Sequence, residues 1–181
     1  MNNTAIKLTY REYLQINDDF NRHEIIEGEH YVTPSPSKRH QKISIKLSTI
    51  LYRWVEDHSL GEVFTGPYDV VLSETDVVIP DLLFVSKSRA SISHEENVQG
   101  APDLIVEILS PSTSRRDLGI KKTLYEKFGV SEYWVIDPDQ KTVEIFKSDA
   151  GKFSSPIRLT FKDQLTSSLF LDLQIPLSQI F

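Results

Sequence analysis

Hydrophobic and polar residues follow helical spacing in some stretches of this chain and extended spacing in others. The clearest helical stretch covers roughly residues 38–58, where apolar side chains recur every three or four residues: Ile43, Leu47, Ile50, Leu51 and Trp54. Near the start of the chain, Thr9 and Glu12 have the spacing of a capping box. This spacing predicts a short first helix that runs through about Asn17.

Extended segments alternate with these helices. Residues 23–33 predict a small hairpin, and residues 62–85 predict two strands. Within a strand predicted at 102–109, Glu107 interrupts an otherwise apolar run, which is typical of a strand covered on both faces. Residues 133–146 predict a second hairpin, and the tail carries two shorter strands.

A third helix is predicted from about 115 to 128, with Ser114 as its N-cap and Gly129 just after its end. Because this helix crosses between two strands, we expect those strands to be parallel. The fold class is therefore α/β (α+β), a mixed central β-sheet flanked by helices. We expect four segments to share that sheet: 62–72, 77–85, 102–109 and 131–137.

Composition narrows the class of protein. The 181 residues fit a single domain, 1–181, and 39% hydrophobic with 25% charged residues is ordinary for a globular protein. The chain has no cysteine, so a metal would need oxygen or imidazole ligands. Nothing resembles a signal peptide or a membrane-spanning run, so we expect a cytoplasmic protein with no membrane partner.

The net charge of −6 argues against a strong non-specific nucleic-acid binder, because such proteins are normally basic. Net charge averages over all faces, however, and basic residues gather in two places along the sequence. These local groups are Lys38, Arg39, Lys42 and Lys46, and then Arg115 and Arg116.

Glu107 is the most informative single residue. Burying an unpaired carboxylate costs roughly several kcal/mol of folding free energy, so Glu107 must be protonated, paired or bound to a cation. Asp81 lies in a similar apolar run at 77–85. Two carboxylates about 4 Å apart repel each other by roughly 4 kcal/mol at an effective dielectric of 20, and a divalent cation between them reverses that sign. Mg²⁺ or Mn²⁺ suits such oxygen ligands.

Lys121 supplies a third group. At about 100° per residue it falls near the middle of the helix face formed by Leu118, Ile120, Leu124, Tyr125 and Phe128, whereas Lys122 points away. Asp117 could pair with Lys121 one turn earlier, and a lysine that snorkels to solvent is the structural alternative. Two carboxylates, a metal ion and a lysine that orients or deprotonates water are the equipment of phosphodiester hydrolysis.

These residues resemble the PD-(D/E)xK nuclease superfamily, with the lysine displaced from position 109, which is Leu109, to Lys121 on the following helix. The wider pattern over roughly residues 8–150 resembles the Uma-type restriction endonucleases. Its pieces are HEIIEGE at 23–29, Pro34 to His40, IPDLLFV at 79–85, PDLIVEILSPST at 102–113, Asp117 to Tyr125 and GVSEYWVIDP at 129–138.

The resemblance implies a restriction-endonuclease-like core with metal at Asp81 and Glu107. Glu24 matches a family glutamate and is a candidate further member of the site; its alternative is a surface hairpin carboxylate. His40, on the apolar side of its helix, is a candidate contact to the metal's water or to the scissile phosphate, with a structural role as the alternative.

Three functions follow from this sequence. The first is a metal-dependent endonuclease that acts on DNA with Mg²⁺, or Mn²⁺ in its place, as a homodimer. The second is a catalytically silent nuclease-fold protein that serves as an interaction or regulatory module. The third is a hydrolase of another phosphodiester. A homodimer is expected for the first because two sites related by a twofold axis cut both strands of a duplex.

Overall fold

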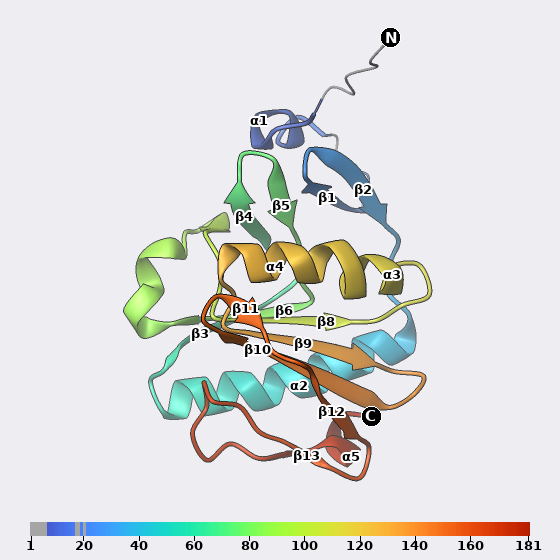
Figure 1. Cartoon of the computed structure of the whole chain (residues 1–181), viewed down its shortest axis with the longest axis vertical. Helices are drawn as coiled ribbons and strands as arrows, with labels where there is room; N and C mark the ends of the chain where they lie inside the picture. Colours follow the sequence, from blue (N-terminus) through green and yellow to red (C-terminus); the bar gives the residue numbers. More distant parts are fainter. Residues whose placement is uncertain (1–6, 17–18, 20) are drawn as a thin grey trace.

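The computed structural model describes residues 7–16, 19 and 21–181. Its largest element is a mixed sheet with the strand order β11-β10-β9-β8-β6-β3, with β12 paired to β10 (Figure 1). The strands are β3 (Gly61–Thr65), β6 (Leu82–Ser86), β8 (Leu104–Ile108), β9 (Glu132–Asp137), β10 (Thr142–Asp149), β11 (Lys152–Phe153) and β12 (Ile157–Thr160). Strands β8 and β9 are parallel, as the crossover predicted, and β6 runs antiparallel to β8.

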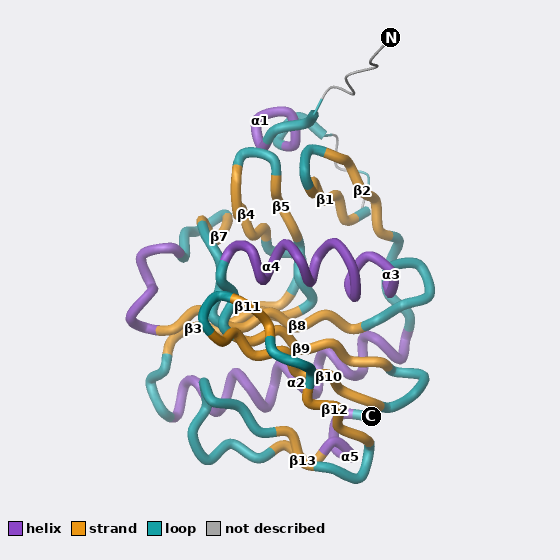
Figure 2. The backbone as a smooth tube through the Cα atoms, viewed as in Figure 1, coloured by secondary structure: helices purple, strands orange, loops and turns teal. Residues whose placement is uncertain are grey.

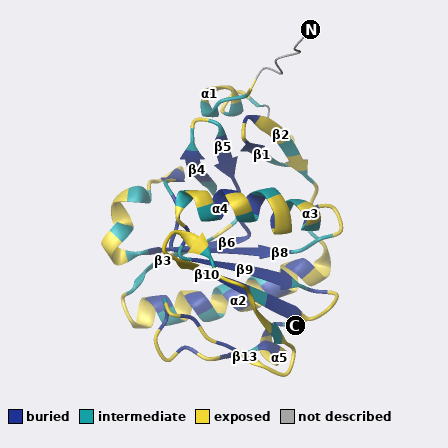
Figure 3. Cartoon of the chain, in the orientation of Figure 1, coloured by how far each residue is buried: buried dark blue, intermediate teal, exposed yellow. Residues whose placement is uncertain are grey.

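Helices cover both faces of this sheet (Figure 1). Helix α2 (Lys38–Asp57) packs Ile43, Leu47 and Leu51 against one face. The crossover after β8 covers the other face with Leu124 and Tyr125. Every residue of β8 is buried (Figure 3), which confirms the strand covered on both faces and explains why its residues are apolar at successive positions.

A second sheet, with the order β2-β1-β5-β4-β7, packs on the crossover side of the main sheet (Figure 2). Its strands are β1 (Arg22–Ile26), β2 (Glu29–Thr33), β4 (Asp69–Ser73), β5 (Asp76–Val78) and β7 (Asn97–Gln99). The hairpin predicted at 23–33 is β1 and β2.

The second sheet corrects one part of the predicted topology. Residues 62–72 contain β3 and β4, and residues 77–85 contain β5 and β6, so each segment is divided between the two sheets. Pro67 and Pro80 lie at the two breaks and have no amide hydrogen to give to a continuous ladder. Apolar residues continue on both sides of each proline, and the hydrophobic pattern therefore shows one strand where the chain forms two.

The remaining helices are short. They are α1 (Tyr10–Tyr13), η1 (Lys87–Ile92), α3 (Ser114–Arg116), η2 (Asp117–Lys121), α4 (Lys122–Phe128) and α5 (Leu177–Ile180). The capping box at Thr9 and Glu12 is present, but α1 ends at Tyr13, and the predicted end at Asn17 lies outside the described residues. The crossover begins one residue earlier than predicted, because Thr113 is the N-cap and Ser114 is the first helical residue.

The crossover contains a π-helical turn, η2, that the sequence pattern did not predict. A π turn closes on i+5 hydrogen bonds and shifts the phase of the residues around it. Asp117, Lys121 and Tyr125, spaced four apart, are all buried. Leu118, which was expected on the buried face, is 43% exposed. Gly129 ends the helix in the left-handed conformation, at φ 83°, as predicted.

The C-terminal segment completes the core on the α2 side. It contains β13 (Gln164–Leu165), β14 (Ile175–Pro176) and α5. Together with β11 and β12, the described tail has four short strands, where two were predicted. Phe170, Ile175 and Ile180 pack into the cluster that includes α2. Within the described residues, no helix combines the length and the apolar character that a membrane span requires.

Candidate active site

Asp81 and Glu107 lie at the same end of two neighbouring strands. The ladder between β6 and β8 pairs Leu82 with Val106 and Leu83 with Ile105. One further step in the same register places Asp81 opposite Glu107, and residues opposite each other in an antiparallel pair project to the same face. The amide of Ile108 donates to Asp81 Oδ2 at 2.9 Å, which fixes the aspartate beside β8.

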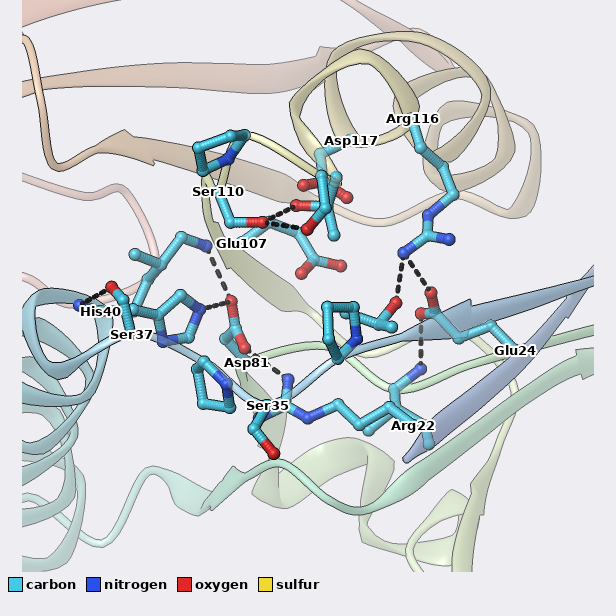
Figure 4. A pocket seen from close by; sticks show the side chains of 18 of the residues that line it. Arg22, Glu24, Ser35, Ser37, His40, Asp81, Glu107, Ser110, Arg116 and Asp117 are labelled. Atoms are coloured by element: carbon cyan, nitrogen blue, oxygen red, sulfur yellow. Dashed lines mark hydrogen bonds and ion pairs between the residues drawn. The ribbon is translucent and has the colours of Figure 1, made fainter. Parts of the chain in front are cut away.

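Both carboxylates line a cavity of about 190 Å³ (Figure 4). Its walls include two loops rich in proline and hydroxyl groups, residues 33–37 and 110–113. Glu24, His40 and Lys121 line the same cavity. The structure therefore brings together the five residues singled out in the sequence: Glu24, His40, Asp81, Glu107 and Lys121.

Asp81 is buried and held by three donors. Arg22 Nη1 lies 2.6 Å from Oδ1, and His40 Nε2 lies 2.9 Å from Oδ2, which also accepts the Ile108 amide (Figure 4). Burial alone would raise the pKa of Asp81. The neighbouring His40 and Arg22, together with the hydrogen bond from the Ile108 amide, outweigh this effect and lower the pKa below its usual value. Asp81 is thus an anion around neutral pH.

Glu107 has the opposite balance. Its Oε1 accepts from Lys121 Nζ at 2.6 Å and from the Tyr125 hydroxyl at 2.8 Å. Burial is the largest effect and raises the pKa of Glu107 to about 8; Lys121 opposes this rise, while the nearby carboxylates reinforce it. In the absence of a metal ion, Glu107 is therefore largely protonated at neutral pH.

Lys121 is the hub of the buried charges. Its Nζ lies 2.6 Å from Glu107, 2.7 Å from Glu24 Oε1 and 3.8 Å from Asp117. Burial by itself would lower the pKa of Lys121, but these three carboxylates outweigh it and raise the pKa above its usual value. Lys122 lies elsewhere, with its Nζ 4.6 Å from the centre of the Phe146 ring. Of the two lysines, Lys121 is the one that reaches the carboxylates, as the helical phase predicted.

Glu24 is buried rather than exposed on a hairpin surface. Its Oε1 accepts the Ile79 amide at 3.0 Å as well as contacting Lys121, and its Oε2 lies 3.3 Å from Arg116 Nη2. His40 is also buried: Nε2 contacts Asp81, and Nδ1 has no hydrogen-bond partner within the described structure. Strand β1 therefore contributes two side chains, Arg22 and Glu24, and helix α2 contributes His40, and each of the three holds a central group of the cavity.

Comparison with known proteins adds a family to this geometry. The family model described as “Putative restriction endonuclease” matches residues 10–178, nearly the whole chain. The chain belongs to this family. An uncharacterized protein of Synechocystis sp. is 28% identical over 151 residues, which cover 80% of this chain and 77% of that one.

The same family likeness extends to the fold. A crystal structure titled as that of a “putative nuclease belonging to DUF820” from Anabaena variabilis superposes with a TM-score of 0.82. It covers 96% of this chain and 97% of its own, at 21% identity. The mixed architecture is thus a restriction-endonuclease-like fold, and the family membership supports a nuclease-like hydrolase as the broad class of activity.

The donor set of the cavity fits a small hard cation. Among the described residues, no three carboxylate or imidazole side chains are grouped so that they could hold a metal ion. Asp81 and Glu107 are the two ligands expected from the sequence, and both line the cavity. Mg²⁺ is commonly held by one or two carboxylates while it keeps several of its waters. His40 also lines the cavity, and its buried Nδ1 has no hydrogen-bond partner among the described residues.

Two cavity residues escaped the sequence analysis. Arg22 contacts Asp81, and Arg116 contacts both Glu24 and, at 2.5 Å, the Thr33 hydroxyl. The sequence did contain a signal for Arg22: it lies two residues before Glu24 on the same strand, so both side chains project to the same face. Arg116 was noted only as part of a local basic group, and nothing in local spacing indicates that it meets β1 and β2.

Proposed function

We propose that this protein is a Mg²⁺-dependent endonuclease that hydrolyses phosphodiester bonds of DNA, with Mn²⁺ able to replace Mg²⁺. The observation that carries the proposal is one cavity that joins Asp81, Glu107 and Lys121. Family membership and the nuclease title of the Anabaena variabilis structure support it. When bound, the metal ion would act as a Lewis acid and would lower the pKa of water.

The chain's own residues would divide the work. Asp81 and Glu107 hold the metal ion through their oxygens, and His40 and Arg22 keep Asp81 in place. Lys121 has a raised pKa, so it stays protonated and does not accept a proton from water. Its ammonium instead orients the attacking water or offsets the negative charge that develops on the scissile phosphate. Lys121 would therefore not be the group that deprotonates the attacking water.

Cations around the cavity suit a phosphodiester. Arg22 and Arg116 each present a guanidinium, a group whose planar fork matches phosphate oxygens. Glu24 holds both Lys121 and Arg116, so it acts as a positioning residue. The charges of the four carboxylates in the cavity would otherwise repel a polyanion, and these three cations reduce that repulsion.

A plasmid-nicking assay tests the proposal. The wild-type chain should convert supercoiled plasmid to open-circular and linear forms with Mg²⁺ or Mn²⁺, but not with EDTA. Lys121→Ala should abolish this activity, whereas Lys122→Ala, the adjacent control, should retain it. Absence of cleavage by the wild type on any nucleic acid, with either metal ion, would overturn the nuclease proposal.

Two alternatives have observations of their own. The catalytically silent module is favoured by the ion pairs and hydrogen bonds that already engage Asp81, Glu107 and Glu24. A hydrolase of another phosphodiester is favoured by the small cavity of about 190 Å³. Activity on bis(p-nitrophenyl) phosphate or on nucleotides, without activity on DNA, would select the hydrolase. Failure on every phosphodiester, with the fold intact, would select the silent module.

The proposal also covers the oligomeric state of the protein and its location in the cell. A homodimer would place two cavities on the two strands of a duplex, and analytical ultracentrifugation with and without a DNA duplex would measure the oligomeric state. The apolar C-terminal segment offers little dimer surface, because most of its large side chains lie in the core. A cytoplasmic location stays a prediction, which cell fractionation measures.

A further inference from the structure

A groove of about 360 Å³ lies outside the carboxylate cavity. Helix α2, the turn between β9 and β10, and the end of the chain form its walls. Its floor is apolar and includes Ile180 and Phe181. Four basic side chains from two separate segments surround that floor: Arg39, Lys42, Lys46 and Lys141.

The groove carries a strong local positive charge. Among the described residues, no aspartate or glutamate side chain lines it, although the whole chain has a net charge of −6. Arg39 pairs with Asp139, which neutralises one charge. Lys46 donates to a main-chain oxygen of Phe181, the last residue of the sequence, at 3.0 Å, and Lys141 lies 5.1 Å from the centre of the Phe161 ring. The Phe161 ring is uncharged, so the ammonium group of Lys141 keeps its full charge.

The position of these cations on α2 is unfavourable for the helix itself. The N-terminal end of a helix carries a partial positive charge, and acidic side chains are the residues that stabilise it. The first turn of α2 has none, and it instead contains Lys38 and Arg39, followed by Lys42. A ligand with several negative charges would compensate both the side chains and the helix end.

The groove and the carboxylate cavity share the start of α2. His40 contacts Asp81 in the cavity, while its neighbour Arg39 lines the groove. From His40 to Lys46 the helix rises by about 9 Å. That length is about three base-pair steps of 3.4 Å on a nucleic acid.

From these observations we propose that the groove binds the phosphate backbone of the nucleic-acid substrate a few nucleotides from the scissile bond. The proposal rests on the proposed function and names the surface that holds the substrate. It also explains how an acidic chain retains a polyanion, since the cavity contains four carboxylates against Arg22, Arg116 and Lys121. The groove supplies the positive field that the cavity lacks.

Binding measurements without cleavage test the groove. Fluorescence anisotropy of a labelled 20-base-pair duplex and of its single strand would be recorded in EDTA and in Ca²⁺ over a salt series. The test variant carries Lys42→Ala, Lys46→Ala and Lys141→Ala. The matched control carries Lys87→Ala, Lys127→Ala and Lys152→Ala, three exposed lysines outside the groove with the same change in charge. Hydrolysis of bis(p-nitrophenyl) phosphate is measured in parallel.

The groove variant should bind at least one of the two probes about tenfold more weakly or worse, with a salt slope smaller by about 2 to 3. The control should bind within twofold of wild type, and all three proteins should hydrolyse the small substrate equally. Equal weakening of both variants, or none in the groove variant, would overturn the groove proposal while leaving the nuclease proposal intact. If the wild type cleaves nothing, but binds nucleic acid more tightly than the groove variant does, the nuclease proposal fails and binding at the groove stands.

Discussion

Lys121 and Glu24 form a buried ion pair, 2.7 Å long, between the crossover of the main sheet and the first hairpin of the second sheet. Both side chains are 3% exposed. The same ammonium contacts Glu107, so a single lysine ties the second sheet to the centre of the cavity. The cavity therefore forms only when the two sheets are packed together, and its charges depend on one another.

Replacing Lys121 should affect stability as well as activity. Lys121→Ala leaves Glu24, Glu107 and Asp117 buried without their shared cation. Breaking a buried ion pair in this way costs about 3–5 kcal/mol, and the cost falls on Glu24 and Asp117 because Glu107 is already largely protonated at neutral pH. Urea unfolding should show this loss for Lys121→Ala and less than about 0.5 kcal/mol for Lys122→Ala.

The activity of a folded Lys121 variant separates its chemical role from its structural one. Assays at a temperature where circular dichroism shows the variant to be folded should give no detectable cleavage by Lys121→Ala. Metal-induced stabilisation should largely remain, because oxygen ligands carry the metal ion. Equal cleavage rates for wild type and folded Lys121→Ala would remove the lysine from the mechanism.

Hydrophobic spacing was sufficient to predict the parts of the fold in which one face of an element is buried. Helix α2 and the all-buried strand β8 follow directly from it. The parallel pairing of β8 and β9 follows from the helix that joins them. Lys121 was separated from Lys122 by helical phase alone, even though η2 changes that phase locally. These features depend on residues close together in the sequence.

The rest depends on contacts between distant residues. The second sheet was missed because the breaks at Pro67 and Pro80 lie inside apolar runs. The ion pairs of Arg22 with Asp81 and of Arg116 with Glu24 join residues that are close only after the sheets pack. The partners of such long-range pairs do not follow from local spacing.

Glu132 provides a test of whether burial alone marks a functional carboxylate. It lies on β9 and is as buried as Glu107, but it accepts from Trp134 Nε1, the hydroxyls of Ser167 and Ser168, and the Ser168 amide. These bonds attach the C-terminal loop to the main sheet. Glu132→Ala should therefore destabilise the fold in thermal or urea unfolding, by about 1–3 kcal/mol for each buried donor left without an acceptor. Cleavage per folded molecule should be unchanged, and a loss of that specific activity would contradict a purely structural role.

His40 is expected to act through Asp81. Its Nε2 holds one carboxylate oxygen, so His40→Ala should lower metal affinity or activity by about 10–100-fold, as for other groups that orient a metal ligand. His40→Gln keeps a polar side chain at this position and should recover part of the loss. Calorimetric titration with Mn²⁺ measures the affinity. Unchanged affinity and activity in His40→Ala would show that Asp81 needs no support from α2.

Metal binding should depend on pH because of Glu107. Burial raises the pKa of its carboxyl to about 8 in the metal-free protein, yet a metal ligand must be deprotonated. Binding near pH 6.5 should therefore release close to one proton. The affinity for Mn²⁺ should rise by about tenfold per pH unit below 8 and level off above it, since a single proton competes with the ion. Calorimetry in buffers of different ionisation enthalpy measures both quantities.

Two variants assign this pH dependence. Glu107→Gln should bind the ion weakly and lose the change in slope near pH 8, because its side chain has no proton to release. His40→Gln should keep that change, which would assign the change to Glu107 rather than to the imidazole of His40. A wild-type affinity that stays constant from pH 6 to 8 would mean that Glu107 either binds no metal ion or is already ionised. If Glu107→Gln keeps the change in slope near pH 8, the proton that competes with Mn²⁺ belongs to another group in the cavity.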